Sequence, residues 1–192
     1  MKIFFFDTDR LVVDAYKAHL SDFPNVEFHY GDFKELPGLF DGIVSPANSF
    51  GYMDGGIDQA YTDYFGKGVQ EKLQLHIDNL PRREMLVGEG VAVVTDHPKF
   101  RTVISAPTMR TPEIIRETAN VFLAMRAVLR VSLLNAMQTI AVPGLGTGIG
   151  KMPPTRCAQQ VRTAMLWEDQ KIKKPESLKE HWMLERALKI YV

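Results

Sequence analysis

The sequence predicts an α/β protein in which helices cover both faces of a sheet, an α/β/α sandwich of three layers. Short apolar runs, typical of buried strands, alternate with longer segments whose apolar residues recur every three or four positions, as in amphipathic helices. Polar or glycine-rich loops follow several of these strands. Ligands in such folds bind beyond the carboxyl ends of the strands, so these loops are candidates for a binding site.

The composition is that of a globular protein with no bias toward nucleic acid or membrane. The 192 residues are 45% hydrophobic and 24% charged, and Lys plus Arg equal Asp plus Glu at 23 each. The single cysteine, Cys157, precludes an intrachain disulfide and is expected to be a small core residue. No apolar run has the length of a signal peptide core or a membrane span. We therefore expect a cytoplasmic protein that acts as a monomer.

The first half of the chain is expected to begin with a strand whose following helix is capped by Asp9 or Thr8. The predicted strands of this half are residues 2–6, 25–30 and 41–45. Each is apolar or alternating and is ended by a turn-forming residue. Two further helices are expected, one from residue 57 or 58 and one over 69–77.

The second half is expected to hold strands over 90–95, 102–105 and 140–142, and helices over 112–136, 155–167 and 177–188. The segment 112–136 has the longest helical periodicity, and Pro112 suits a first helical turn. Ser177 and Glu180 have the spacing of a capping box. The basic connector 171–175 is expected to be a solvated surface.

The stretch 139–153 is the most distinctive part of the sequence. An apolar strand is followed by glycines that alternate with larger residues: Gly144, Gly146, Gly148 and Gly150. Bare backbone N–H groups in such a loop can approach a phosphate closely, although a flexible turn would also need glycines. The loop is not a P-loop, because Leu145 stands where that motif needs glycine, and Ile149 stands where the dinucleotide fingerprint needs its third glycine.

Two other strand ends carry polar or glycine-rich residues that could converge with this loop on one cleft. The carboxylate of Asp32 can accept a hydrogen bond from an exocyclic amine such as that of adenine, and Asn48 can both donate to and accept from a ribose diol. The glycines at 55–56 could face the second loop across a diphosphate. Ordinary structural roles are the alternatives: Asp32 capping a turn, Asn48 forming an Asx-turn, and the glycines relieving a tight bend.

Together these segments resemble the macro domain family, which binds ADP-ribose. Residues 31–33, Gly-Asp-Phe, are similar to the family's Gly-Asp-Ile, and residues 41–48 to its Asp-Ala-Ile-Val-Asn-Ala-Ala-Asn. Residues 55–58, Gly-Gly-Ile-Asp, match the end of its first glycine loop, and residues 143–153 match its second in length. The resemblance covers about 26–164 of a single macro-like domain over 1–192, with the N-terminal strand and helix and the C-terminal helix as extensions. It also implies a mixed sheet.

The resemblance assigns roles to individual residues. Asp32 would hold the adenine amine, backbone amides of the two loops would hold the diphosphate, and Asn48 would position the distal ribose. Asp58 would orient or activate a water, although it could instead be an ordinary acidic residue at a helix start. The implied catalytic residues are Asn48 and Asp58, and the implied ligand-binding residues are Asp32, Phe33, Ala47, Asn48, Gly55, Gly56, Ile57, Gly146, Thr147, Gly148, Ile149 and Gly150. No cofactor is implied, and the histidines lack the spacing of metal ligands.

Several positions depart from the family's pattern, mostly toward the distal-ribose end. Ser45 and Pro46 replace Asn-Ala, and Gly146 replaces a serine. Met53 and Asp54 replace glycines, and Asp54 brings a negative charge toward the diphosphate. Gly150 replaces an aromatic residue that stacks on the distal ribose, and the Lys151 that follows could contact a phosphate or attack the sugar.

We therefore expect an enzyme that binds ADP-ribose and hydrolyses one of its derivatives. Candidate substrates are an ADP-ribosylated acidic side chain, O-acetyl-ADP-ribose and ADP-ribose 1″-phosphate. A binding module for ADP-ribose without turnover is the first alternative. A magnesium-dependent phosphatase is the second, because a strand that ends in Asp7 and Asp9 resembles the start of haloacid dehalogenase-type phosphotransferases. The expected partner is ADP-ribose or an ADP-ribosylated molecule, not nucleic acid or membrane.

Overall fold

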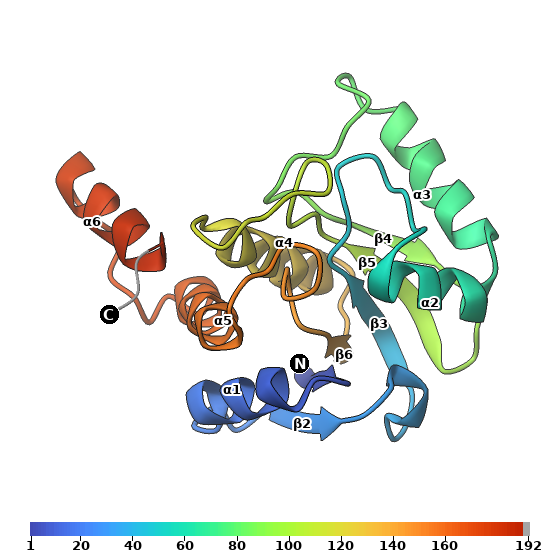
Figure 1. Cartoon of the computed structure of the whole chain (residues 1–192), viewed down its shortest axis with the longest axis horizontal. Coiled ribbons are helices and arrows are strands. Elements are labelled where there is room, and N and C mark those ends of the chain that lie inside the picture. The colour runs from blue at the N-terminus through green and yellow to red at the C-terminus, as the bar shows by residue number, and fades with distance from the viewer. Residues whose placement is uncertain (190–192) are drawn as a thin grey trace.

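The computed structural model describes residues 1–189, and in that range a six-stranded sheet lies between two layers of helices (Figure 1). The strands are β1 (Lys2–Asp7), β2 (Val26–Tyr30), β3 (Phe40–Ser45), β4 (Val91–Val94), β5 (Phe100–Ser105) and β6 (Thr139–Val142). Their order is β2-β1-β6-β3-β5-β4, with every neighbouring pair parallel except β4 and β5. The predicted α/β/α architecture with a mixed sheet is confirmed.

The helices divide between the two faces of the sheet. They are α1 (Arg10–Leu20), α2 (Gly56–Phe65), α3 (Gly68–Asp78), α4 (Asn120–Leu134), α5 (Pro154–Glu168) and α6 (Leu178–Lys189). Figure 1 shows α1, α4 and α5 on one side and α2 and α3 on the other. In β1, Ile3 and Phe5 pack with the first group, whereas Phe4 and Phe6 pack with the second. Successive side chains of a strand point to opposite faces, so this apolar run is buried on both.

The N-terminal strand β1 lies inside the sheet, not at its margin. It pairs with β2 on one side and with β6 on the other. The segment expected as an extension thus supplies a central strand. The carboxyl end of β1, at Asp7, consequently lies between the strand ends that precede Asp32 and Gly144.

The helix predicted over 112–136 is shorter than expected, because α4 begins only at Asn120. The residues before it form turns, so the expectation that Pro112 starts the helix is wrong. Ile115 is buried at 1% exposure, and its N–H donates to the carbonyl of Gly150 at 2.8 Å. A contact with the distant glycine loop therefore overrides the local helical periodicity.

The C-terminal helix α6 is attached to α5 through buried polar side chains. Arg156 Nη1 and Gln160 Nε2 donate to the carbonyl of Leu188 at 2.9 and 2.8 Å. At its other end, the Glu180 N–H donates to Ser177 Oγ at 3.2 Å, as the capping spacing predicts. Figure 1 shows α6 projecting beside α5. Among residues 1–189, no helix has the length and apolar character that a membrane crossing requires.

Candidate functional site

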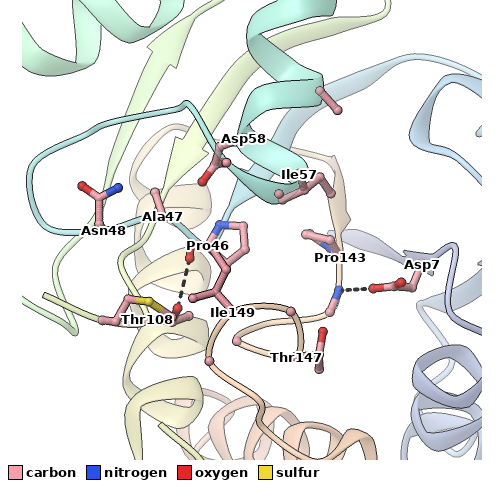
Figure 2. A pocket seen from close by; sticks show the side chains of 18 of the residues that line it. Asp7, Pro46, Ala47, Asn48, Ile57, Asp58, Thr108, Pro143, Thr147 and Ile149 are labelled. Atoms are coloured by element: carbon pink, nitrogen blue, oxygen red, sulfur yellow. Dashed lines mark hydrogen bonds between the residues drawn. The ribbon is translucent and has the colours of Figure 1, made fainter. Parts of the chain in front are cut away.

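A cavity of about 420 Å³ lies along the carboxyl edge of the sheet. Because the parallel strands all end at this edge, loops from distant parts of the sequence border one space. The predicted residues that border it are Asp32, Phe33, Ala47, Asn48, Gly55, Gly56, Ile57, Asp58, Gly146, Thr147, Gly148, Ile149 and Gly150. The structure thus brings together every residue that the family resemblance implied as catalytic or ligand-binding. Figure 2 shows Ile57 and Asp58 across the cavity from Thr147 and Ile149.

The second glycine loop is attached to the N-terminal segment of the chain. Asp7 Oδ2 accepts the N–H of Gly144 at 3.1 Å (Figure 2), and Tyr16 donates its hydroxyl to the carbonyl of Pro143 at 3.0 Å. A Cβ at Gly144 would lie 2.6 Å from Asp7 Oδ2, so glycine is required for this approach. The amide of Gly144 is consequently used by a carboxylate, which leaves the later amides of the loop for a ligand.

Two later glycines of this loop are needed for packing. Gly146 has φ +68°, and a Cβ there would lie 2.6 Å from Ile115 Cδ1. A Cβ at Gly150 would lie 2.6 Å from the carbonyl oxygen of Gly146 and 2.7 Å from Ile115 Cγ1. Ile115 thus occupies the space beside Gly150, where an aromatic side chain was expected from the family's pattern. Gly148, by contrast, has open space around its Cβ position.

The first loop is held by the side chain of Asn48. Asn48 Oδ1 accepts the N–H groups of Phe50 and Tyr52 at 3.1 and 3.3 Å, and Nδ2 donates to the carbonyl of Tyr52 at 2.8 Å. The Asx-type role considered for Asn48 is therefore present. Met53, which stands where the family's pattern has a glycine, is fully buried, and its N–H donates to Gln70 Oε1. Its side chain is therefore part of the hydrophobic core.

Asp58 is the most perturbed carboxyl group at the cavity. It lies in the first turn of α2 at 7% exposure and accepts a 2.6 Å hydrogen bond from Ser45 Oγ. Burial raises the pKa of Asp58 from 3.8 to about 7; the hydrogen bond from Ser45 opposes that rise, and the charge of Asp54 adds to it. A carboxyl group with such a pKa can accept a proton at neutral pH and later return it.

Three other acidic residues considered from the sequence, Asp7, Asp9 and Asp32, have hydrogen-bond partners on the backbone. Asp32 Oδ1 accepts the N–H of Lys34 at 2.9 Å and caps the short 3₁₀ helix Phe33–Glu35, so the capping role considered for it is present. Asp9 caps α1 by accepting the N–H of Leu11 at 2.9 Å. Asp7 accepts the N–H of Asp9 at 2.8 Å in addition to that of Gly144. Both oxygens of Asp7 are thus hydrogen-bonded, which disfavours it as a phosphatase nucleophile.

Several cavity residues were not nominated from the sequence. They include Phe6, Thr8, Tyr52, Thr108, Met109 and Pro112. Asp7, which also borders the cavity, was considered only as a phosphatase nucleophile. For Phe6, Asp7 and Thr8 the missing signal was the place of β1 in the sheet, which no local pattern reveals. Among the residues described here, Lys151 is exposed and outside the cavity lining, and residues 1–189 contain no cluster of three or more His, Cys, Asp or Glu side chains that could hold a metal ion.

Comparison with known proteins identifies a family and solved structures with this fold. The model of the Macro domain family matches residues 44–161, more than half of the chain. The chain belongs to the macro domain family. The first strand, α1 and β2 precede the matched segment, and α6 follows it.

Two curated relatives align over part of their length. An uncharacterized protein of Aquifex aeolicus is 34% identical over 113 residues, which are 59% of this chain and 65% of the relative. An uncharacterized protein of Aeropyrum pernix is 29% identical over 124 residues, 65% of this chain and 62% of the relative. The chain thus spans slightly less than two thirds of each relative.

Solved structures share the fold at low sequence identity. The macrodomain of Mycobacterium tuberculosis DarG has a TM-score of 0.58 and 21% identity, over 73% of this chain and 89% of that one. A mutant Oceanobacillus iheyensis macrodomain with ADPR has a TM-score of 0.61 and 19% identity, over 71% and 74%. The Trypanosoma brucei macrodomain in complex with ADP-ribose has a TM-score of 0.53 and 21% identity, over 67% and 53%.

Proposed function

We propose that this protein binds ADP-ribose and hydrolyses a bond between the distal ribose of an ADP-ribose derivative and its substituent. The observation that carries the proposal is the buried Asp58, hydrogen-bonded to Ser45, on the same cavity as two amide-bearing loops. Solved macrodomains with ADPR or ADP-ribose bound have the same fold, which supports ADP-ribose as the ligand class.

The diphosphate would lie between the start of α2 and the second glycine loop. The N-cap of α2 is Gly55, which has no side chain to accept the first amides of the helix. The N–H groups at the start of a helix, with the helix dipole, favour an anion. Gly146 to Ile149 border the cavity opposite, and the hypothetical Cβ of Gly55 would lie 3.8 Å from Ile149 Cδ1, so the two loops nearly meet.

At one end of the diphosphate, the half-buried Asp32 would accept a hydrogen bond from the adenine amine. At the other end, Asp58 would take a proton from a water whose oxygen attacks the anomeric carbon or an ester carbonyl on that ribose. The proton taken up by Asp58 would pass to the departing oxygen as the bond breaks, so the products are ADP-ribose and the freed acid. The pKa of Asp58, raised to about 7 by burial, suits this exchange.

Calorimetry with ADP-ribose tests the binding half of the proposal. Asp32→Ala is expected to weaken binding by roughly 1–3 kcal/mol, the cost of removing one partner from a buried polar group. Asp63→Ala is a matched control, because Asp63 is exposed on α2 and is not part of the cavity lining. No heat with millimolar ADP-ribose would overturn the proposal, and an unchanged affinity of the Asp32 variant would overturn the adenine assignment.

A binding module without turnover is a second candidate, favoured by one observation. Asn48 Oδ1 already accepts two N–H groups of its own loop, and Nδ2 donates one of its two hydrogens to Tyr52, so only one N–H of this amide is left to orient a ribose. Incubation with O-acetyl-ADP-ribose separates the two candidates. Release of acetate that Asp58→Asn abolishes supports the hydrolase, whereas tight binding with no release by the unaltered protein supports the module.

A further inference from the structure

The charged residues that border the cavity are all acidic. Four carboxylates line it, Asp7, Asp32, Asp54 and Asp58, and no Lys, Arg or His is among the described residues that do. None of the four forms a salt bridge with another residue in 1–189. An anionic ligand in this cavity therefore meets backbone amides and hydroxyl groups as donors, but no cationic side chain among the described lining residues.

The order of the strands divides these carboxylates between the two ends of the cavity. Asp7 ends β1 and Asp32 follows β2, at one side of the sheet, whereas Asp54 and Asp58 follow β3. The loop after β6 lies between them, because β6 separates β1 from β3. The amides of this loop are thus central, whereas those at the start of α2 lie between Asp54 and Asp58 in the chain. A further phosphate at either end would meet a pair of carboxylates.

The wall at the β3 and β5 side is suited to an uncharged group. Tyr52 borders the cavity and is 55% exposed, and Met109 and Pro112 lie along the same side. Their surfaces offer apolar contact within the cavity that Asp54 and Asp58 also line. Like charges at close range near a protein surface repel appreciably, whereas an ester or acyl group adds no charge.

We propose that the cavity takes ADP-ribose derivatives whose distal ribose carries an uncharged ester and rejects those that carry a phosphate there. The inference rests on the proposed function and narrows it, because it removes ADP-ribose 1″-phosphate from the candidate substrates. Asp54 is the specificity-determining residue of this proposal, since it is exposed, follows the same strand as Asn48 and Asp58, and has no cation among the residues that line the cavity with it.

The test compares the affinities of ADP-ribose and ADP-ribose 1″-phosphate by calorimetry at pH 8, together with their affinities for two variants. The unaltered protein is expected to bind the phosphate at least about tenfold more weakly than ADP-ribose. In Asp54→Asn, the ratio of the dissociation constants of ADP-ribose 1″-phosphate and ADP-ribose is expected to be several-fold smaller. Asp63→Asn, an exposed change on α2 outside the cavity, is expected to leave it unchanged.

The outcomes separate this inference from the proposed function. Equal or tighter binding of the phosphate by the unaltered protein, or its turnover as fast as that of O-acetyl-ADP-ribose, overturns the inference while ADP-ribose binding stands. An unchanged ratio in Asp54→Asn overturns the role of Asp54. Absence of binding by both ligands overturns the proposed function, and the inference with it.

Discussion

Ser45 Oγ donates a 2.6 Å hydrogen bond to Oδ1 of Asp58, and both side chains are buried. Ser45 is the last residue of β3, and Asp58 lies in the first turn of α2, so the bond joins a strand end to a helix start. A hydrogen bond to a carboxylate favours its charged form, whereas burial favours the neutral form. The balance of the two, with the charge of Asp54, leaves the pKa of Asp58 at about 7.

Ser45→Ala should raise the pKa of Asp58 further above about 7, because the change removes the one hydrogen bond that opposes burial. The shift is measured by following the Asp58 carboxyl carbon in an NMR titration. If turnover depends on the charged form of Asp58, the rise of activity with pH moves to higher pH in the variant.

Ser105→Ala is the matched control for this prediction. Ser105 ends β5, pairs in register with Ser45, and is equally buried, but its Oγ has no hydrogen-bond partner among the described residues. This variant should leave the Asp58 titration in place. The interpretation of Ser45 fails if both variants titrate like the unaltered protein.

Asp58→Asn should make the folded protein more stable than the unaltered protein at alkaline pH, and the stabilisation should be much smaller at pH 4. The folded pKa of about 7 lies above the ordinary 3.8, so between these values the folded state holds a proton that the unfolded state has lost. Stability of the unaltered protein therefore falls as pH rises through this window, by at most about 1.4 kcal/mol per pH unit from this group.

Urea unfolding of both proteins from pH 4 to pH 8 measures this difference. The difference in the free energy of unfolding between the variant and the unaltered protein should grow up to about pH 7 and then level off. The reason is that the asparagine side chain does not titrate, whereas the carboxyl group of Asp58 does. The amide oxygen can still accept from Ser45, so the fold is retained. A gap that is constant across the pH range would contradict the assigned pKa.

Gly150→Ala should destabilise the protein by about 1–3 kcal/mol, the usual cost of inserting atoms into a packed site. The new Cβ would lie 2.6 Å from the Gly146 carbonyl oxygen and 2.7 Å from Ile115 Cγ1. Gly148→Ala is the control two residues earlier, where the Cβ has open space and φ is not positive. Thermal unfolding should show a loss only in the first variant; similar curves for both would refute the packing role of Gly150.

Tyr16→Phe should cost roughly 1–3 kcal/mol, because it leaves the buried carbonyl of Pro143 without the hydroxyl that donates to it. The same change should weaken ADP-ribose binding, since Pro143 opens the loop proposed to hold the diphosphate. Urea unfolding and calorimetry measure the two effects. Tyr30→Phe, on an exposed side chain, should change neither; equal effects of the two variants would exclude a specific role for the Tyr16 hydroxyl.

Local patterns in the sequence were sufficient for the elements and for the family's motifs. The apolar residues of β1 and β6 and the periodicities of α1 and α5 predicted strands and helices that the structure contains. The turn residues that follow these elements predicted where the candidate loops lie. Such features depend on neighbouring residues, which is why they can be inferred without tertiary structure.

One prediction failed and one structural role was missed, both because of contacts between residues far apart in the chain. The helix expected from Pro112 starts at Asn120, because Ile115 packs against Gly146 and Gly150. The role of Asp7 was missed because the hydrogen bond from Gly144 joins residues 137 positions apart. Neither contact has a signature in the residues beside it.

From its residues alone, this chain could be assigned to the α/β class and to the macro domain type, with candidate ligand residues in the loops that follow its strands. The position of β1 between β2 and β6, the packing of Ile115 beside Gly150 and the desolvation of Asp58 next to Ser45 became evident in the folded chain. Burial and electrostatic environment arise from side chains that the whole sheet brings together, whereas periodicity and turn chemistry act between near neighbours.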